Sequence, residues 1–297
     1  MTIRIGIDLG GTKTEIIALD EHGAALLRRR AATPEDDYEE ALALIARLVH
    51  EVETEIGTAV TIGIGTPGAP SPTTGRMRNS NSRCLNGKLF QPDIERVLGR
   101  KVRLANDANC FSLSEAVDGA AKGAPVVFGV ILGTGVGGGI VVNGHVLIGP
   151  NVAVGEWGHN PLPWAEDRER PGPLCYCGKH GCIETFLSGP GLARDHEKYT
   201  NACLAAKEIV QRATDGDPAA AASLRRYENR LARSLSSIIN VLDPDVIVLG
   251  GGLSNIARLY DNVPQLWKRW AFTDMVRTKL VRNVHGDSGG VRGAAWL

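Results

Sequence analysis

The chain has 297 residues, 43% of them hydrophobic, and its 33 basic and 33 acidic side chains give a formal net charge of zero. This length and composition allow two domains with a substantial core, and the neutral charge argues against nucleic acid or an anionic membrane surface as a partner. Because no apolar run reaches the ~18 residues that span a bilayer, and the N-terminus shows no signal-peptide pattern, we expect a cytoplasmic protein with no membrane partner.

The first third of the chain has the pattern of strands and turns around one long helix. We expect three antiparallel strands, then a helix, then two more strands, over residues 3–9, 15–19, 24–30, 36–56, 60–65 and 102–105. The last strand runs into Asn106-Asp107-Ala108-Asn109, a sequence typical of a helix start. We expect this helix to continue to about Ala121.

The composition turns small and flexible between residues 119 and 125, and a strand–turn–strand pattern then restarts. We expect two strands, a long helix and a further strand, over residues 126–132, 140–143, 217–242 and 246–249. The long helix begins at Asp217-Pro218, an N-cap residue followed by proline at the first helical position. The repeated opening pattern predicts two α/β domains of related topology, residues 1–117 and 118–286.

Glycine-rich loops follow three of the expected strands, at residues 8–13, 133–138 and 250–252. Backbone N–H groups in such loops can approach an anion closely, and Thr12 and Lys13 can add side-chain donors. The second loop matches G-x-G-x-x-G, but a strand follows it where a dinucleotide fingerprint needs a helix. We expect a helix after the third loop, with an anion site at its N-terminus.

Together the loops predict a site for a nucleotide polyphosphate, and Asp8 at its strand end could hold Mg²⁺ through water. For the first loop, a plain hairpin turn is the alternative. The candidate nucleotide-binding residues are Asp8, Gly10, Gly11, Thr12, Lys13, Gly133, Thr134, Gly135, Gly137, Gly251 and Gly252.

Three thiols and an imidazole gather in the segments 155–159 and 175–184. Cys175, Cys177 and Cys182 with His159 give the donor set of a closed tetrahedral zinc site, with no open position for chemistry. His180, inside the cysteine loop, is a rival fourth ligand, and reduced cysteines without a metal are the alternative. Glu156 and Glu184 are interleaved with the ligands, so a structural Zn²⁺ would also hold two carboxylates in place.

These loops and segments together resemble the ROK family of sugar kinases, within the actin-like ATPase superfamily. The resemblance rests on the first two glycine loops, on residues 106–109 and 155–159, and on the cysteine motif, and it covers essentially the whole chain. Within the family, residues 79–82, 85–87, 160–164 and 285–291 are most similar to bacterial fructokinases of the manno(fructo)kinase type.

The resemblance implies an α/β fold of two actin-like ATPase (ribonuclease H-like) domains with a nucleotide and sugar cleft between them. It also implies that residues 287–297 pack back on the first domain and that the protein is a homodimer. The implied reaction is ATP-dependent phosphorylation of D-fructose to D-fructose 6-phosphate, with N-acetylglucosamine, glucose or mannose as alternative substrates.

Asp107 would act as the general base, although it could instead be only a helix N-cap. The residues implied to hold the sugar are Asn81, Asn106, Asp107, Glu156, His159 and Glu184.

Two other classes of function compete with a kinase. A sugar-responsive transcriptional repressor of the same family would need a DNA-binding segment ahead of the first strand, where only Met1-Thr2 stand. A catalytically dead nucleotide-binding scaffold would not need Asp107. We therefore expect an enzyme that uses ATP, Mg²⁺ and a structural Zn²⁺.

Overall fold

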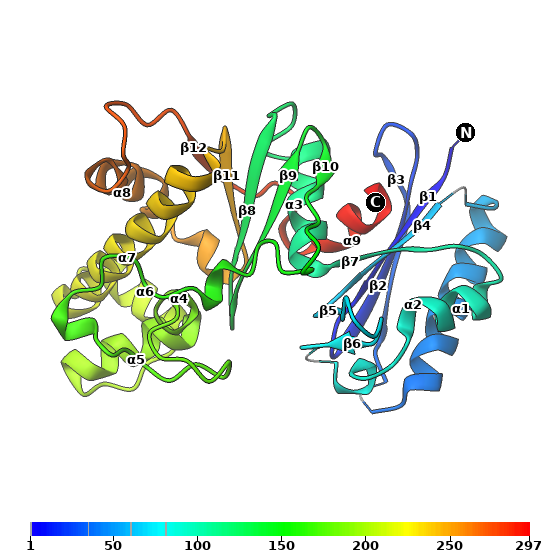
Figure 1. Ribbon diagram of the computed structural model, residues 1–297, viewed down its shortest axis with the longest axis horizontal. Helices are drawn as coiled ribbons and strands as arrows, with labels where there is room; N and C mark the ends of the chain where they lie inside the picture. Colours follow the sequence, from blue (N-terminus) through cyan, green and yellow to red (C-terminus); the bar gives the residue numbers. More distant parts are fainter. Residues whose placement is uncertain (1, 35, 60, 81) are drawn as a thin grey trace. The chain divides into compact units, whose positions relative to one another are not determined.

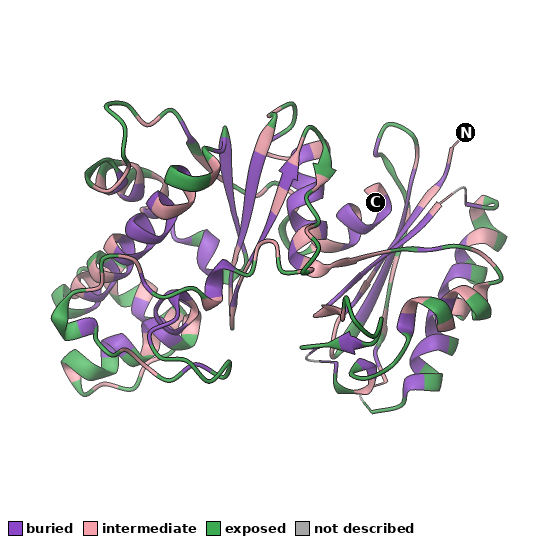
Figure 2. Cartoon of the chain, viewed as in Figure 1, coloured by how far each residue is buried: buried purple, intermediate pink, exposed green. Residues whose placement is uncertain are grey.

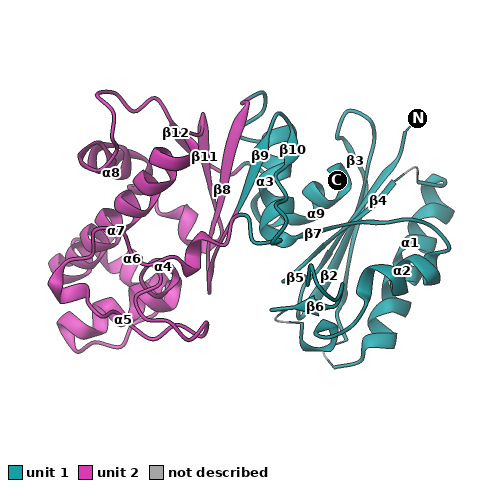
Figure 3. Cartoon of the chain, viewed as in Figure 1, with its two compact units in different colours: residues 1–123, 139–154, 284–297 teal, residues 124–138, 155–283 magenta. Residues whose placement is uncertain are grey.

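The computed structural model describes residues 2–34, 36–59, 61–80 and 82–297. The chain divides into two compact units, shown in Figure 3. Unit 1 comprises residues 1–123, 139–154 and 284–297, and unit 2 comprises residues 124–138 and 155–283. The domain division at 117/118 stays a prediction, because compactness does not define which residues move as one body.

Unit 1 is built on a five-stranded sheet whose strand order is β3-β2-β1-β4-β7 (Figure 1). The strands, in chain order, are β1 (Arg4–Leu9), β2 (Lys13–Leu19), β3 (Ala25–Ala32), β4 (Thr61–Thr66) and β7 (Arg103–Asn106). The first three strands are antiparallel, which confirms the expected opening, whereas β1, β4 and β7 run parallel. The carboxyl ends of the three parallel strands therefore lie at one edge of the sheet.

Period-two alternation gives the two faces of this sheet different partners. On β2, Ile16 belongs to the large core that includes side chains of α1 (Tyr38–Ile56) and α2 (Phe90–Leu98). Its neighbour Ile17 packs instead with Val291 of α9 (Gly289–Trp296). The strands β1, β2 and β4 are largely buried, whereas the edge strands β3 and β7 are exposed or half-buried (Figure 2).

Helix α9 approaches the sheet backbone to backbone. A Cβ added at Gly63 of β4 would lie 1.8 Å from the carbonyl oxygen of Ala294, and one at Gly6 of β1 would lie 2.1 Å from that of Val291. Gly293 makes the same kind of approach to α3 (Asp107–Val117), since its Cβ would lie 1.6 Å from the Cys110 carbonyl oxygen. Only glycine at these positions lets α9 lie between the sheet and α3.

Helix α3 ends at Val117, so the expectation that it continues to about Ala121 is wrong. The next residue, Asp118, leaves helical geometry with φ −137° and ψ 11°. Its carboxylate accepts hydrogen bonds from His285 Nε2 at 2.9 Å and from Trp296 Nε1 at 3.1 Å, and it also pairs with Arg292. The helix thus ends at a C-cap residue directly before Gly119, and the carboxylate of this residue is held by residues far along the chain.

A second five-stranded sheet has the order β10-β9-β8-β11-β12. Its strands are β8 (Val126–Leu132), β9 (Val136–Val142), β10 (His145–Val146), β11 (Val246–Gly250) and β12 (Lys279–Arg282). In unit 2, β8, β11 and β12 run parallel. Strand β9 continues from unit 2 into unit 1 after Gly138.

The helices of unit 2 follow the glycine loops and the cysteine segment. They are α4 (Ile183–Leu187), α5 (Gly189–Thr200), α6 (Ala206–Thr214), α7 (Pro218–Leu242) and α8 (Leu259–Leu266). Helix α7 confirms the expected long helix, and the Asp217 side chain caps it by accepting the N–H groups of Ala219 and Ala220. Two-residue strands β5 (Ala69–Pro70) and β6 (Met77–Arg78) pair in unit 1. No helix among the described residues combines the length and apolar character that crossing a membrane requires.

A buried ion-pair network fastens the segment before the cysteine loop to α7. Glu169 accepts hydrogen bonds from Arg230 Nε at 2.7 Å and Arg233 Nη2 at 2.8 Å. Arg230 also binds Asp195 of α5 at 2.7 Å, and Arg233 donates to the Trp164 carbonyl oxygen at 2.6 Å. Because all four charged side chains are buried, each needs its partners to remain ionised away from water.

Gly63→Ala tests the close approach of α9 to the sheet. The added methyl group cannot coexist with the Ala294 carbonyl, so we expect a loss of about 3 kcal/mol or more in the free energy of unfolding. Chemical denaturation followed by circular dichroism measures this loss. The matched control is Gly252→Ala, where nothing lies within 4 Å of the added Cβ and the loss should stay below about 1 kcal/mol. Equal losses in the two variants would contradict the account.

Candidate functional site

Unit 1 gathers three of the predicted residues at the carboxyl edge of its parallel strands. Asp8 is near the end of β1 and lies opposite Gly65 of β4 in the register. Asn106 ends β7 opposite Thr66, and Asp107 is the first residue of α3. Parallel strand pairing therefore brings together residues that lie about a hundred positions apart in the sequence.

Asp8 is an unusual carboxyl group. Burial raises its pKa from 3.8 to about 6, and the charges of Asp107 and Glu15 add to the effect, whereas Lys13 opposes it. Glu15 is its cross-strand neighbour and is paired with Arg28 and Arg30, each at 2.5 Å. A divalent cation would relieve the repulsion between Asp8 and Asp107, and carboxylate oxygens are ligands that Mg²⁺ prefers. These residues therefore fit the expected Mg²⁺.

Asn106, and not Asp107, is the N-cap residue of α3. Its Oδ1 accepts the Ala108 N–H at 2.9 Å, and its Nδ2 donates to the Gly68 carbonyl oxygen at 3.3 Å. Asp107 Oδ1 also accepts the Ala108 N–H, at 2.8 Å. The sugar-binding role of Asn106 stays a prediction, and so does the role of Asp107 as a base. Asn81 lies outside the described residues.

The first glycine loop is the tight turn between β1 and β2. The Gly10 N–H donates to the Lys13 carbonyl oxygen at 3.0 Å, which closes the turn. Thr12 and Lys13 are exposed at its tip, and Gly11 is half-buried between Gly10 and Thr12. The loop thus has the form of a hairpin turn that also presents a hydroxyl and an ammonium group, so its phosphate-binding role stays a prediction.

The second and third glycine loops lie close together in unit 2. The second turns sharply, because the Gly133 N–H donates to the Gly135 carbonyl oxygen at 3.0 Å. A strand follows as expected, but β9 begins at Val136 and not at residue 140, so the last glycines of the motif lie in the strand. Gly251 has φ +78°, and a Cβ there would lie 2.5 Å from the Leu132 carbonyl oxygen at the end of β8. A single 3₁₀ turn, Gly252–Asn255, comes directly after Gly251, so the expected helix N-terminus is wrong. Strand β11 ends at Gly250, and the 3₁₀ turn ends before Ile256, its C-cap residue.

The four predicted metal ligands form one cluster. One ligand atom from each of His159, Cys175, Cys177 and Cys182 can be chosen so that all lie within 4.8 Å of one another. Cys175 Sγ is 3.5 Å from His159 Nδ1, and Cys177 Sγ is 3.6 Å from Cys182 Sγ. Zinc bonds of about 2.3 Å to sulfur and 2.0 to 2.1 Å to nitrogen place tetrahedral ligands roughly 3.6 to 3.8 Å apart. The residues therefore fit a structural Zn²⁺.

His180 is not part of this cluster. Its side chain is exposed, and its Nδ1 lies 3.2 Å from the Gly172 carbonyl oxygen. The Nε2 of His159, a residue expected from the sequence to hold the sugar, lies 2.9 Å from the Tyr176 hydroxyl. Tyr176 stands between two of the cysteine ligands in the sequence, and its side chain is exposed.

Glu184 has a partner that the sequence did not reveal. Its Oε2 accepts the backbone N–H of Val136, in the second glycine loop, at 2.9 Å. Glu156 is exposed and precedes the 3₁₀ turn Trp157–His159. Both carboxylates thus stay candidates for binding sugar hydroxyls, but one oxygen of Glu184 already accepts a hydrogen bond from the loop.

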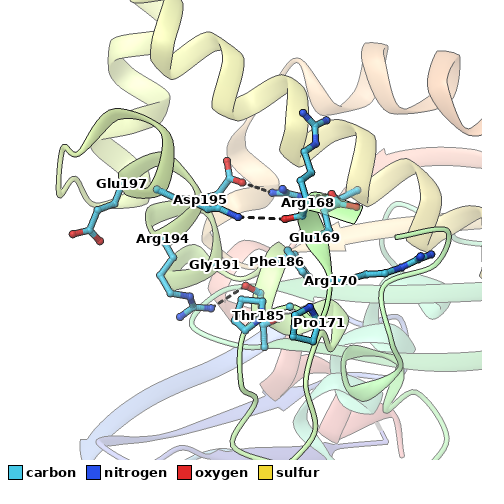
Figure 4. Close-up of a pocket in the computed structure, with 14 residues that line it drawn as sticks. Arg168, Glu169, Arg170, Pro171, Thr185, Phe186, Gly191, Arg194, Asp195 and Glu197 are labelled. Atoms are coloured by element: carbon cyan, nitrogen blue, oxygen red, sulfur yellow. Dashed lines mark hydrogen bonds and ion pairs between the residues drawn. The ribbon is translucent and has the colours of Figure 1, made fainter. Parts of the chain in front are cut away.

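A hollow of about 500 Å³ in unit 2 is separate from these groups (Figure 4). Arg168, Phe186 and Arg194 are among the residues that line it, and Arg194 donates to the Thr185 carbonyl oxygen at 2.9 Å. None of the residues predicted to bind sugar, nucleotide or metal lines it. We therefore do not assign the catalytic chemistry to this hollow.

Comparison with known proteins places these groups in context. A model of the ROK family matches residues 4–297. The chain is 41% identical to a protein from Erwinia tasmaniensis named N-acetyl-D-glucosamine kinase and 40% identical to one of the same name from Vibrio cholerae. Each alignment covers 98% of both chains.

Two solved structures extend the likeness to the fold. The ROK hexokinase from Thermus thermophilus has 30% identity and a TM-score of 0.87, covering 99% of this chain and 97% of that one. A ROK-family glucokinase from Streptomyces griseus, in complex with glucose and AMPPNP, has 28% identity and a TM-score of 0.77, covering 99% and 98%. These matches confirm the α/β fold of actin-like ATPase type.

Asp8→Asn should stabilise the ligand-free protein in a pH-dependent way. Because the folded-state pKa of Asp8 lies above that of an exposed aspartate, the folded protein binds this proton more tightly, and stability falls as the pH rises from about 4 through about 6. A shift of about two units corresponds to at most about 3 kcal/mol. We expect the variant to gain about 1 to 3 kcal/mol at pH 7.5 and little at pH 4.5, measured by urea denaturation. A gain that does not change with pH would refute the electrostatic explanation.

Elemental analysis of protein purified without a chelator should find one zinc per chain. Burial raises the pKa of the Cys182 thiol to about 12, so a cation is needed to hold it as the thiolate that binds zinc. His159→Ala should lose the metal and His180→Ala should retain it. The reverse result would make His180 the fourth ligand, and zinc-free wild-type protein would rule out the site.

Proposed function

Because the chain belongs to the ROK family, as a sugar kinase, we propose that it transfers the γ-phosphoryl group of ATP to N-acetyl-D-glucosamine. This choice of substrate is supported by the 41% identity to a protein named N-acetyl-D-glucosamine kinase, over 98% of both chains. Fructose, the substrate first expected from the sequence, has no support from these relatives. It is the first competitor to test.

Asp107 is the general base in this proposal. A sugar hydroxyl is a weak nucleophile at neutral pH, so a carboxylate that accepts its proton during phosphoryl transfer increases the rate. The start of α3 holds Asp107 by its bond to the Ala108 N–H, and Asp107 lies close enough to Asp8 for its charge to help raise the pKa of Asp8. Rigid strand and helix ends suit a reaction that depends mainly on positioning.

Asp8 and the glycine loops serve the nucleotide in the same proposal. Mg²⁺, when bound, neutralises phosphate charge. Burial raises the pKa of Asp8, and a cation bound nearby would lower that pKa again. Binding of the Mg²⁺ nucleotide and deprotonation of Asp8 therefore favour each other. Thr12 and Lys13, at the tip of the first loop, supply side-chain donors for phosphate oxygens.

The sugar is held by hydroxyl-binding groups from the predicted set. Glu156 and the Glu184 Oε1 are carboxylate acceptors, and His159 Nε2 would exchange its Tyr176 partner for a sugar hydroxyl. A homodimer, as the family resemblance implies, is part of the proposal and is checked by sedimentation.

ADP release with Mg-ATP and each of four sugars tests the function. We expect N-acetyl-D-glucosamine to have a higher kcat/KM than fructose, mannose or glucose. Asp107→Asn should lower kcat by about 10² to 10⁴, because it keeps the side-chain shape and removes the base.

Another preferred sugar would keep the kinase and reject this substrate. Loss of sugar-dependent turnover in a folded wild-type protein that still binds ATP would reject the kinase proposal as a whole. Unchanged turnover in Asp107→Asn would exclude Asp107 as the base.

A further inference from the structure

The cluster of His159, Cys175, Cys177 and Cys182 joins two segments that both contact the second glycine loop, residues 133–138. We infer that this cluster positions residues 133–138 and so sets the affinity for the nucleotide, in addition to any effect on the sugar. The inference rests on the proposed function, in which this loop holds phosphates of ATP. Everything that carries it lies within unit 2.

The first segment, residues 155–160, reaches the loop through Trp157 and Gly158. The indole Nε1 of Trp157 donates to the Gly137 carbonyl oxygen at 2.9 Å. A Cβ at Gly158 would lie 2.1 Å from the Val136 carbonyl oxygen, so this segment passes the loop backbone to backbone. The next residue is His159, the nitrogen ligand of the cluster.

The second segment reaches the loop through Glu184. Cys182, a sulfur ligand of the cluster, is the N-cap residue of α4, and Glu184 lies in the first turn of that helix. Its Oε2 holds the Val136 N–H at 2.9 Å, and a Cβ at Gly135 would lie 2.7 Å from the same oxygen. Val136 is thus contacted at its N–H by one segment and at its carbonyl group by the other.

The cluster fastens the two segments to each other. Cys175 Sγ and His159 Nδ1 are 3.5 Å apart, and Cys182 Sγ is 3.5 Å from the His159 carbonyl oxygen. Backbone pairing supports the same junction, because the Ile183 N–H donates to the Asn160 carbonyl oxygen at 2.9 Å. Ligand side chains that hold this junction therefore also fix the distance between the two contacts on Val136.

Glu184 is a positioning residue in this arrangement, because it acts on the nucleotide through the loop. An amide side chain at this position would still offer an oxygen to the Val136 N–H, whereas a methyl group would not. Other contacts also hold residues 133–138. The Gly189 N–H donates to the Gly133 carbonyl oxygen at 2.8 Å, Trp157 Nε1 donates to the Gly137 carbonyl oxygen, and residues 136–138 belong to β9. Losing the Glu184 contact should loosen one side of the loop without unfolding it.

The test measures the dissociation constant of ADP by calorimetry, without sugar. We expect Glu184→Ala to weaken ADP binding at least tenfold and Glu184→Gln to weaken it less than threefold. Gly135→Ala should also weaken it at least tenfold, because the added methyl displaces the Glu184 carboxylate. The double variant Gly135→Ala/Glu184→Ala should be no weaker than either single variant, since both break one contact.

Two matched controls separate this role from a sugar role and from general damage. Glu156→Ala removes a carboxylate of the first segment that has no bond to the loop, so it should change the KM for sugar and leave ADP binding unchanged. Cys177→Ser, in the cluster, should weaken ADP binding at least fivefold. Cys203→Ser changes an exposed thiol outside the cluster and should leave ADP binding unchanged.

An ADP dissociation constant within twofold of wild type in Glu184→Ala, with only the sugar KM raised, would overturn the inference. So would wild-type protein that does not bind ADP at all. If wild type binds ADP but phosphorylates none of the four sugars, the proposed function fails, and the ADP constants of the variants still decide the inference.

Discussion

The contact between α9 and the glycines of β1 and β4 is the constraint on which unit 1 depends. Burying a helix against a sheet normally leaves a layer of side chains between the two backbones, but Gly6 and Gly63 remove that layer. Gly293 allows the same close approach between α9 and α3. Helix α3 is consequently drawn close to the strand ends as well. Asp107, the first residue of α3, is then near enough to Asp8 to raise its pKa, so the electrostatics of the candidate site depend on the packing of the helix.

Unit 2 also uses glycines to bring backbone segments into close contact. Gly158 and Gly135 allow two segments to touch the loop at Val136, where a larger residue at either position would push them away. The loop itself is too rich in glycine to hold one shape by its own preferences, because glycine loses the most backbone freedom on folding. Strand β9, which begins at Val136, fixes one part of the loop, and the indole of Trp157 and the carboxylate of Glu184 add contacts from other segments.

The parts of the fold that the sequence revealed are those with a local pattern. The three opening strands, β8 and the capped helix α7 have clear periodicity or punctuation, and the metal ligands have a distinctive spacing. The parts that it did not reveal depend on distant partners. Helix α3 stops where Asp118 meets His285 and Trp296, and Glu184 bonds a residue 48 positions earlier. Neither contact can be recognised from the residues next to it in the sequence.

The packing of α9 also orders the events of folding. Residues 4–66 provide strands of the first sheet and are synthesised early, but the face of Ile17 and Leu19 is covered by Val291 and Ala295. During synthesis, a chain that emerges at about 5 to 20 residues per second leaves that face uncovered until residues 289–296 have appeared. The unit that is made first is therefore finished last, and a nascent chain must keep an incomplete sheet from associating with other molecules throughout the synthesis of unit 2.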